Sequence, residues 1–410
     1  MKIPIKKIDS AFFYIVLIDI LFFPYIRFLG VSLSMLLVPI WFIISVKRIS
    51  LDREDLLCFL AIFCSIVSFI IGIYIYNNGV ILRNGDLAPP FSAFLPNTII
   101  IIFSFLYFVF FKRIILKYNF SINKIIALYM LFLVLLNTIY FYDPTLFFKI
   151  RANWTLSNNV IEVGEVLSMY RFTSTFSDPN NFATIANATL AFILMNDNIN
   201  KFYKLTSIPL VFYLLVGAMS NTGFVVFSII LVVFFIRTNF FELKTINSIL
   251  KNFILSIIAI LTFIITFIYV NETSIGSTAF ERVESNSLDS RLEIWDRTID
   301  VVKILSSIFY GDGGLAIIDG RVINPHTGHL HLIYNYGVIF YIIFLYVFFR
   351  KRQSNSYFNH LFMLSILIGF TVNVGVYELR FVGIMAVLTA TLYTNRRLYI
   401  NESRNCSSRL

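Results

Sequence analysis

Long apolar runs cover most of this sequence and recur along it twelve times. A helix needs about 17 to 25 residues to cross a hydrocarbon core of roughly 30 Å. The chain is 58% hydrophobic and 14% charged, whereas roughly a quarter of the residues in a soluble domain are charged. We therefore expect an all-α, polytopic integral membrane protein. We place its spans near 11–26, 28–46, 56–76, 98–116, 123–142, 181–197, 205–219, 222–237, 252–270, 328–349, 360–375 and 381–395.

Basic residues gather at alternate ends of these runs and predict the topology. Short cytoplasmic loops are rich in Lys and Arg. If the chain starts inside, 22 basic and 7 acidic residues lie in cytoplasmic segments, against 11 basic and 15 acidic outside. Both termini are then cytoplasmic. The net charge of +10 is explained by basic residues in cytoplasmic loops, so it does not indicate a nucleic-acid partner and we expect none.

This topology leaves two long segments outside, 143–178 and 271–327, on what we treat as a single membrane domain over 1–410. The larger loop contains Ser290-Arg-Leu-Glu293, which has the form of a capping box, followed by apolar residues at helical spacing. We predict an amphipathic helix at about 290–309 that lies on the membrane surface or packs on the bundle. In the smaller loop, Asp178 and Pro179 suit the start of the next span.

Two arginines near these expected helix starts suggest an anion site. Arg171 precedes Asp178 by seven residues, and Arg291 lies in the first turn of the loop helix. A guanidinium can bind phosphate oxygens in a bidentate way, and helix N-termini favour anions. Two such arginines would suit a pyrophosphate. The alternative for Arg291 is that it projects into water or pairs with a neighbouring carboxylate.

Three of the four histidines lie between 326 and 331. His326 precedes the expected helix and is the best candidate for a proton-transfer group, because imidazole titrates near neutral pH. His329 and His331 are two residues apart and are expected to pack or to form hydrogen bonds. A metal site built from His326, His329 and Glu378 is conceivable, but its spacing matches no standard ligand pattern, so we expect no metal.

Two more ionisable residues have open interpretations. Asp19 lies in the middle of the first apolar run, where an acid is either functional or satisfied by a neighbouring helix. Arg380 lies in the last short external turn, directly after Glu378 and Leu379. Arg380 is either a third phosphate contact or an anchor at the membrane interface.

Three segments together resemble the superfamily of bacterial O-antigen polymerases and O-antigen ligases. The first is 171–183, RFTSTFSDPNNFA, similar to that family's pattern of Arg, Asp-Pro-Asn and Phe-Ala before a span. The second is 290–295, SRLEIW, followed by Gly311-Asp-Gly313. The third is His326 with Leu330 and Gly337. The chain departs from the family at Thr327, where Asn is common, and at Ser220-Asn221, where ligase-like members often carry Ser-Arg, which favours a polymerase.

The resemblance implies a glycosyltransferase of the bacterial inner membrane with its active site on the periplasmic side. Its expected reaction polymerises O-antigen repeat units carried on undecaprenyl pyrophosphate, for lipopolysaccharide biosynthesis. His326 would be the general base, Arg171 and Arg291 would bind the pyrophosphate, and Arg380, Glu378 and Asn180 are possible additional site residues. No cofactor is expected, because the donor is already activated, and the expected partners are the lipid-linked saccharides, membrane lipids and a chain-length regulator. The alternatives are an O-antigen ligase, which transfers polymer to lipid A core, and a flippase or other transporter.

Overall fold

The computed structural model describes residues 5–22, 32–45, 51–82, 85–118, 120–154, 171–176, 178–196, 198–237, 298–318, 321–323, 327–350, 361–371 and 375–393. These residues are mostly helical. The chain divides into two compact units, a boundary that the sequence analysis did not predict. Unit 1 comprises Met1–Phe120, Leu288–Ser354 and Phe370–Leu410, and unit 2 comprises Ser121–Ser287 and Asn355–Gly369.

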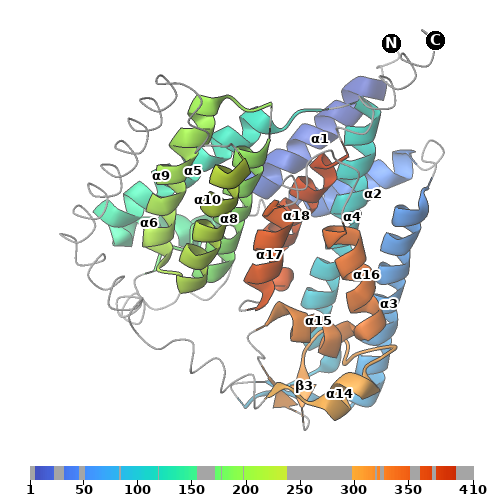
Figure 1. Ribbon diagram of the computed structural model, residues 1–410. Coiled ribbons are helices and arrows are strands. Elements are labelled where there is room, and N and C mark those ends of the chain that lie inside the picture. Colours follow the sequence, from blue (N-terminus) through green and yellow to red (C-terminus); the bar gives the residue numbers. More distant parts are fainter. Residues whose placement is uncertain are drawn as a thin grey trace. The chain divides into compact units, whose positions relative to one another are not determined.

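Unit 1 is built around one long helix, α4 (Pro90–Tyr118), which packs against helices from both ends of the chain (Figure 1). Its interior is rich in phenylalanine, and Phe105 of α4 contacts the rings of Phe340, Phe344 and Phe348. The other helices of unit 1 in the described residues are α1 (Ile5–Leu21), α2 (Leu33–Ser45), α3 (Arg53–Ile75), α14 (Val301–Ser306), α15 (Gly328–Tyr336), α16 (Val338–Phe349), the 3-10 helix η3 (Gly375–Tyr377) and α18 (Leu379–Thr391).

Unit 2 contains a helix in each of its predicted spans that the structure describes, and one helix more. The additional helix, α6 (Pro144–Trp154), lies inside the segment 143–178 that we predicted as an external loop. The others are α5 (Asn123–Tyr142), α8 (Pro179–Met195), α9 (Lys201–Ala218), α10 (Asn221–Arg237) and α17 (Leu361–Thr371), whose last two residues belong to unit 1.

The helices bear out an all-α membrane protein. Four of them, α3, α4, α5 and α9, are long and apolar enough to cross a membrane, and five shorter apolar helices accompany them in the described part. The predicted span at 252–270 lies outside the described residues, as does the first part of the predicted loop helix. Of that helix, residues 298–309 are described, and α14 within them begins at a cap of its own, because the Asp300 carboxylate accepts a hydrogen bond from the backbone N–H of Lys303.

The predicted span at 328–349 is broken into α15 and α16 at Gly337. This glycine has φ 94°, and a side chain there would meet the backbone of Ser307 and Tyr310 at 2.9 Å. The first N–H groups of α16 bond outside the helix, from Val338 to the Ser307 carbonyl at 2.8 Å and from Ile339 to the Ile308 carbonyl at 3.1 Å. The break thus lets the large loop bind to the helix start through its backbone.

A small sheet, which the sequence analysis did not predict, joins the loop after α3 to the large loop. Its strands β1 (Val80–Ile81), β2 (Leu87–Ala88), β3 (Ile317–Ile318) and β4 (Arg321–Val322) have the order β2-β1-β4-β3. The pairs β1–β2 and β3–β4 are antiparallel hairpins, and β1 pairs with β4 in parallel. The sheet therefore ties the loops together where α3 ends and α4 begins.

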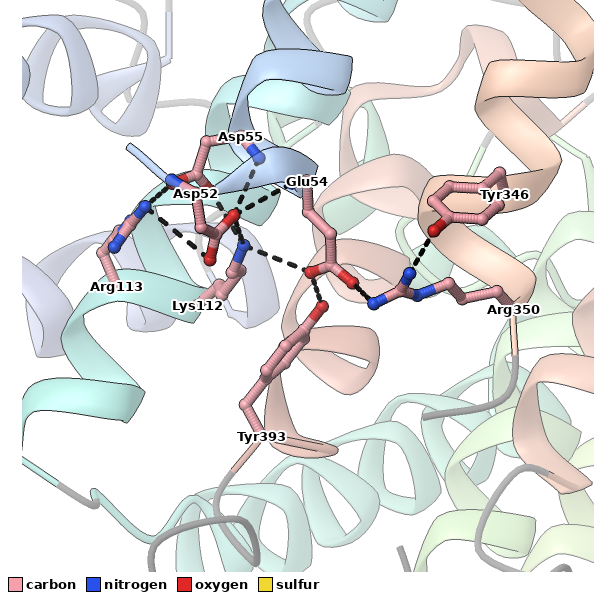
Figure 2. A network of polar contacts seen from close by, with 8 residues as sticks. All are labelled: Asp52, Glu54, Asp55, Lys112, Arg113, Tyr346, Arg350 and Tyr393. Atoms are coloured by element: carbon pink, nitrogen blue, oxygen red, sulfur yellow. Dashed lines mark hydrogen bonds and ion pairs between the residues drawn. The ribbon is translucent and has the colours of Figure 1, made fainter. Parts of the chain in front are cut away.

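A network of charged residues holds the opposite ends of these helices together (Figure 2). Lys112 of α4 is fully buried, and its Nζ lies 2.7 Å from Asp52, 3.1 Å from Glu54 and 2.9 Å from Asp55 at the start of α3. Arg113 pairs with Asp55, and Glu54 also binds two residues from the ends of α16 and α18, Arg350 and Tyr393. The start of α3 and the ends of α4, α16 and α18 thus meet at one place, as the predicted alternation of spans requires.

Replacing Lys112 should destabilise unit 1 strongly, because three carboxylates would lose their buried cation. We expect Lys112→Ala to lower the free energy of unfolding by about 3–5 kcal/mol. The matched control is Lys117→Ala on the same helix, whose side chain is 48% exposed and pairs with Asp9; it should cost less than about 1 kcal/mol. Denaturant unfolding in detergent measures both. Equal losses would show that the network does not stabilise the unit.

Candidate functional site

The structure describes four of the six predicted site residues. Arg171 and Asn180 lie in unit 2, and Glu378 and Arg380 lie in unit 1. The proposed base His326 and the second proposed pyrophosphate ligand, Arg291, lie outside the described residues. The described part of the chain contains no group of three His, Cys, Asp or Glu side chains placed to hold a metal ion.

Arg171 lies at a junction of three helix ends. Its Nε donates to the Ala218 carbonyl at 3.0 Å, and one terminal nitrogen donates to the Met219 carbonyl at 3.1 Å and to Asn180 Oδ1 at 3.1 Å. Ala218 and Met219 end α9, whose last carbonyls carry partial negative charge. Arg171 therefore caps α9 and joins it to the first turn of α8, a structural role that the sequence analysis did not identify.

Asn180 and Ser220 continue this junction to the third helix. The Ser220 hydroxyl donates to Asn180 Oδ1 at 2.9 Å and accepts the backbone N–H of Gly223 at 3.1 Å, in the first turn of α10. One amide oxygen thus accepts from both Arg171 and Ser220. This arrangement holds the Arg171 guanidinium in place, and the role of Asn180 is to position that guanidinium.

Asp178 and Pro179 start α8 as predicted. The Asp178 carboxylate accepts the backbone N–H groups of Asn180 at 2.7 Å and Asn181 at 3.4 Å, and Pro179 occupies the first turn. Because the carboxylate already holds these donors, the start of α8 does not offer them to a phosphate. An anion at this junction would have to be bound by side chains.

Three consecutive hydroxyl residues follow Arg171 in the chain. Thr173, Ser174 and Thr175 are buried, with exposed fractions of 6%, 1% and 4%. Their side-chain oxygens have no hydrogen-bond partner among the described residues. The loop is held by its backbone: the Phe172 N–H donates to the Gly217 carbonyl, and Ser174 has φ 53°. Buried hydroxyls normally find a partner, so this loop has the chemistry to bind phosphate or sugar oxygens.

Arg380 and Asp19 lie inside unit 1. Arg380 is 3% exposed at the start of α18, and Asp19 is 4% exposed on α1, where the positive charge of Arg380 acts on it. Asp19 also accepts the Ser34 N–H at 2.8 Å. One Asp19 oxygen is thus satisfied by the start of α2, whereas Oδ1 has no hydrogen-bond partner among the described residues, so both interpretations of Asp19 stay open. Arg380 has an acidic neighbour in the protein itself, and Glu378, directly before α18, is 9% exposed.

The prediction that His329 and His331 pack or form hydrogen bonds is confirmed. His329 Nδ1 lies 3.0 Å from the Tyr341 hydroxyl, and its ring contacts Phe370. His331 is 5% exposed, and its ring lies edge-on to Tyr377.

Asp312 is a residue whose role the sequence analysis missed. It lies in the turn Gly311–Gly314 and is 5% exposed. Its carboxylate accepts Lys303 Nζ at 2.6 Å, the Tyr76 hydroxyl at 3.2 Å and the Ile317 N–H at 3.3 Å. Burial raises the pKa of Asp312, and the Lys303 charge opposes that rise. The turn itself packs closely, since a side chain on Gly72 of α3 would clash with the Asp312 carbonyl oxygen.

Comparisons with known proteins gave no match: no protein-family model, curated protein or solved structure matched this chain.

The α8 cap gives a prediction for unit 2. Asp178→Ala should lower the free energy of unfolding by about 1 kcal/mol, because two N–H groups of the first turn lose their acceptor. Asp178→Ser keeps an acceptor and should cost a few tenths of that amount. Denaturant unfolding in detergent compares the two, and equal losses for Ala and Ser would contradict the capping role.

A second prediction concerns the buried charges of unit 1. Asp19→Asn and Arg380→Gln should each destabilise the protein, since each removes a charge of opposite sign that acts on the other buried residue. The double variant should lose less than the two single losses added together, by about 0.5–3 kcal/mol. A double-mutant cycle of unfolding free energies measures this coupling, and additive losses would show that the two residues act independently.

Proposed function

We propose that this protein is an O-antigen polymerase that joins lipid-linked repeat units at the outer face of the bacterial inner membrane. The donor is a growing saccharide on undecaprenyl pyrophosphate, and the acceptor is the terminal sugar of another lipid-linked repeat. The acceptor hydroxyl oxygen attacks the anomeric carbon of the donor, a new glycosidic bond forms, and the bond to the pyrophosphate oxygen breaks. Lipid pyrophosphate leaves, and the acceptor proton passes to His326.

The observation that carries this proposal is the loop of Arg171, Thr173, Ser174 and Thr175. A leaving pyrophosphate needs hydrogen-bond donors and positive charge where negative charge develops. The loop supplies three buried hydroxyls whose oxygens lack partners in the described part. They begin two residues after Arg171, whose guanidinium is fixed by Asn180 and two carbonyls. The motifs at 171–183, 290–295 and 326–337 supply the same chemistry by resemblance.

Arg291 and His326 complete the proposed mechanism. Arg291 is the second pyrophosphate ligand, because a bidentate guanidinium matches phosphate geometry. His326 is the general base, since an imidazole with a pKa near neutrality can take a proton and release it again. A chain-length regulator is the proposed protein partner. Among the rival functions, the ligase shares the same donor and loop chemistry, and Ser220-Asn221 in place of Ser-Arg favours the polymerase.

The decisive test removes hydroxyls that have no structural partner in the described part. In the double variant Thr173→Val/Thr175→Val, valine keeps the shape of threonine, so the unfolding free energy should stay within about 0.5 kcal/mol or rise. Polymerisation should fall by about a hundredfold, because transition-state contacts are lost. Lipopolysaccharide from the native host, resolved on a gel, measures the result: we expect core carrying a single repeat in place of a ladder.

The control is Thr206→Val, a half-buried threonine of α9 whose hydroxyl bonds only to its own helix in the described contacts; its ladder should be unchanged. Arg291→Ala and His326→Ala should give the same single-repeat core. Core without any repeat would indicate a ligase or flippase. An unchanged ladder in the double threonine variant, with the protein present in the membrane, would refute the role of the loop.

A further inference from the structure

The segment around α14 exposes an apolar surface. Five of its side chains are largely outside the protein: Val301 is 63% exposed, Val302 76%, Leu305 62%, Ile308 39% and Phe309 73%. We call these five residues the apolar ridge. None of the residues of α14 is buried. A rigid surface of this composition needs a covering medium, since contiguous exposed apolar patches mark interaction sites.

Hydrogen bonds hold the backbone of the ridge on unit 1. The ridge side chains are therefore exposed on a fixed segment of the protein. On one side of α14, the Tyr334 hydroxyl accepts the Asp300 N–H at 3.1 Å and donates to the Thr298 carbonyl at 2.7 Å. On the other side, the carbonyls of Ser307 and Ile308 accept the first N–H groups of α16. The main chain is thus held at both ends of α14.

The charges next to the ridge are turned toward the protein. Lys303, the cation of α14, bonds to Asp312 at 2.6 Å, and its side chain is 21% exposed. Asp300 accepts the Lys303 N–H as the helix cap. Both charged residues of the segment 298–310 therefore bond to other groups of the protein. The exposed surface of the segment is formed mainly by the apolar residues of the ridge.

The ridge is continuous with exposed apolar side chains at the end of α3. Tyr76 bonds to Asp312 and so brings the end of α3 next to α14, and Figure 1 shows α14 beside that end of α3. The two residues before Tyr76 are exposed, Tyr74 by 81% and Ile75 by 50%. Because α3 is apolar and long enough to span a membrane, we expect its exposed side chains to face lipid and its end to lie at the bilayer boundary.

We propose that the apolar ridge is inserted in the bilayer, at the boundary between headgroups and acyl chains where α3 ends. The ridge contacts lipid: its apolar side chains lie among the lipid molecules at this boundary, and the Lys303–Asp312 pair faces the protein. This gives the large loop a membrane anchor of its own, built from Val302, Leu305 and Phe309. The anchor does not depend on the proposed function, since it follows from exposure, fastening and position alone.

The test places a nitroxide label on the ridge of the full protein in lipid nanodiscs. Val302→Cys and Phe309→Cys carry the label in separate variants, and Cys64 and Cys406 are replaced by Ser, while the fully buried Cys58 stays. Two positions calibrate the signal: Ile70→Cys on the exposed side of α3 for lipid, and Asn78→Cys in the turn after α3 for water. Electron paramagnetic resonance compares accessibility to dissolved oxygen with accessibility to a water-soluble nickel complex.

The expected ratio of oxygen to nickel accessibility at Val302 and Phe309 is close to that at Ile70. It should exceed the ratio at Asn78 about threefold or more, because interfacial apolar side chains sit roughly 5–10 Å into the boundary. A ratio equal to that at Asn78 would place the ridge in water and overturn the proposal. Low accessibility to both reagents would also overturn it, because a second copy of the chain or another protein would then cover the ridge.

Discussion

The structure depends on one constraint: a charged or polar group that leaves water for the interior of a membrane protein must find its partner in the protein. Lys112 meets this constraint with three carboxylates, and one oxygen of Asp19 meets it with the N–H of Ser34. Arg171 meets it with the last carbonyls of α9. Lys112 joins α4 to α3, Asp19 joins α1 to α2, and Arg171 joins α9 to α8, so the pairing of polar groups also selects which helices pack together.

The loops of unit 1 are held by close contacts between backbones, which are possible because glycine has no side chain at these positions. Gly337 breaks an apolar run so that α16 can bond to the carbonyls of the large loop, and the turn at Gly311–Gly314 packs against Gly72 of α3. Side chains at these positions would separate the backbones. The segment that contains α14 is consequently held at one level of unit 1, where α3 ends.

Much of the helical architecture was predictable because long apolar runs have one main structural outcome in a membrane. The start of α8 was also predictable, since Asp178 and Pro179 are local signals. The break at Gly337 was not, because the apolar run continues through it and its cause is the distant carbonyls of Ser307 and Ile308. The two-residue strands are too short to show a periodicity. For the site, the sequence indicated that Arg171 matters, but its capping of α9 depends on Ala218 and Met219, which only the folded chain brings near.

The most direct test of the proposed glycosyl transfer uses the purified protein in lipid vesicles with undecaprenyl-pyrophosphate-linked repeat units as the only saccharide. The native protein should join the repeat units into longer lipid-linked chains and release one undecaprenyl pyrophosphate for each bond formed. The His326→Ala protein should form no such chains under the same conditions. Repeat units that stay single with the native protein, but are transferred when lipid A core is supplied, would contradict the account and identify a ligase.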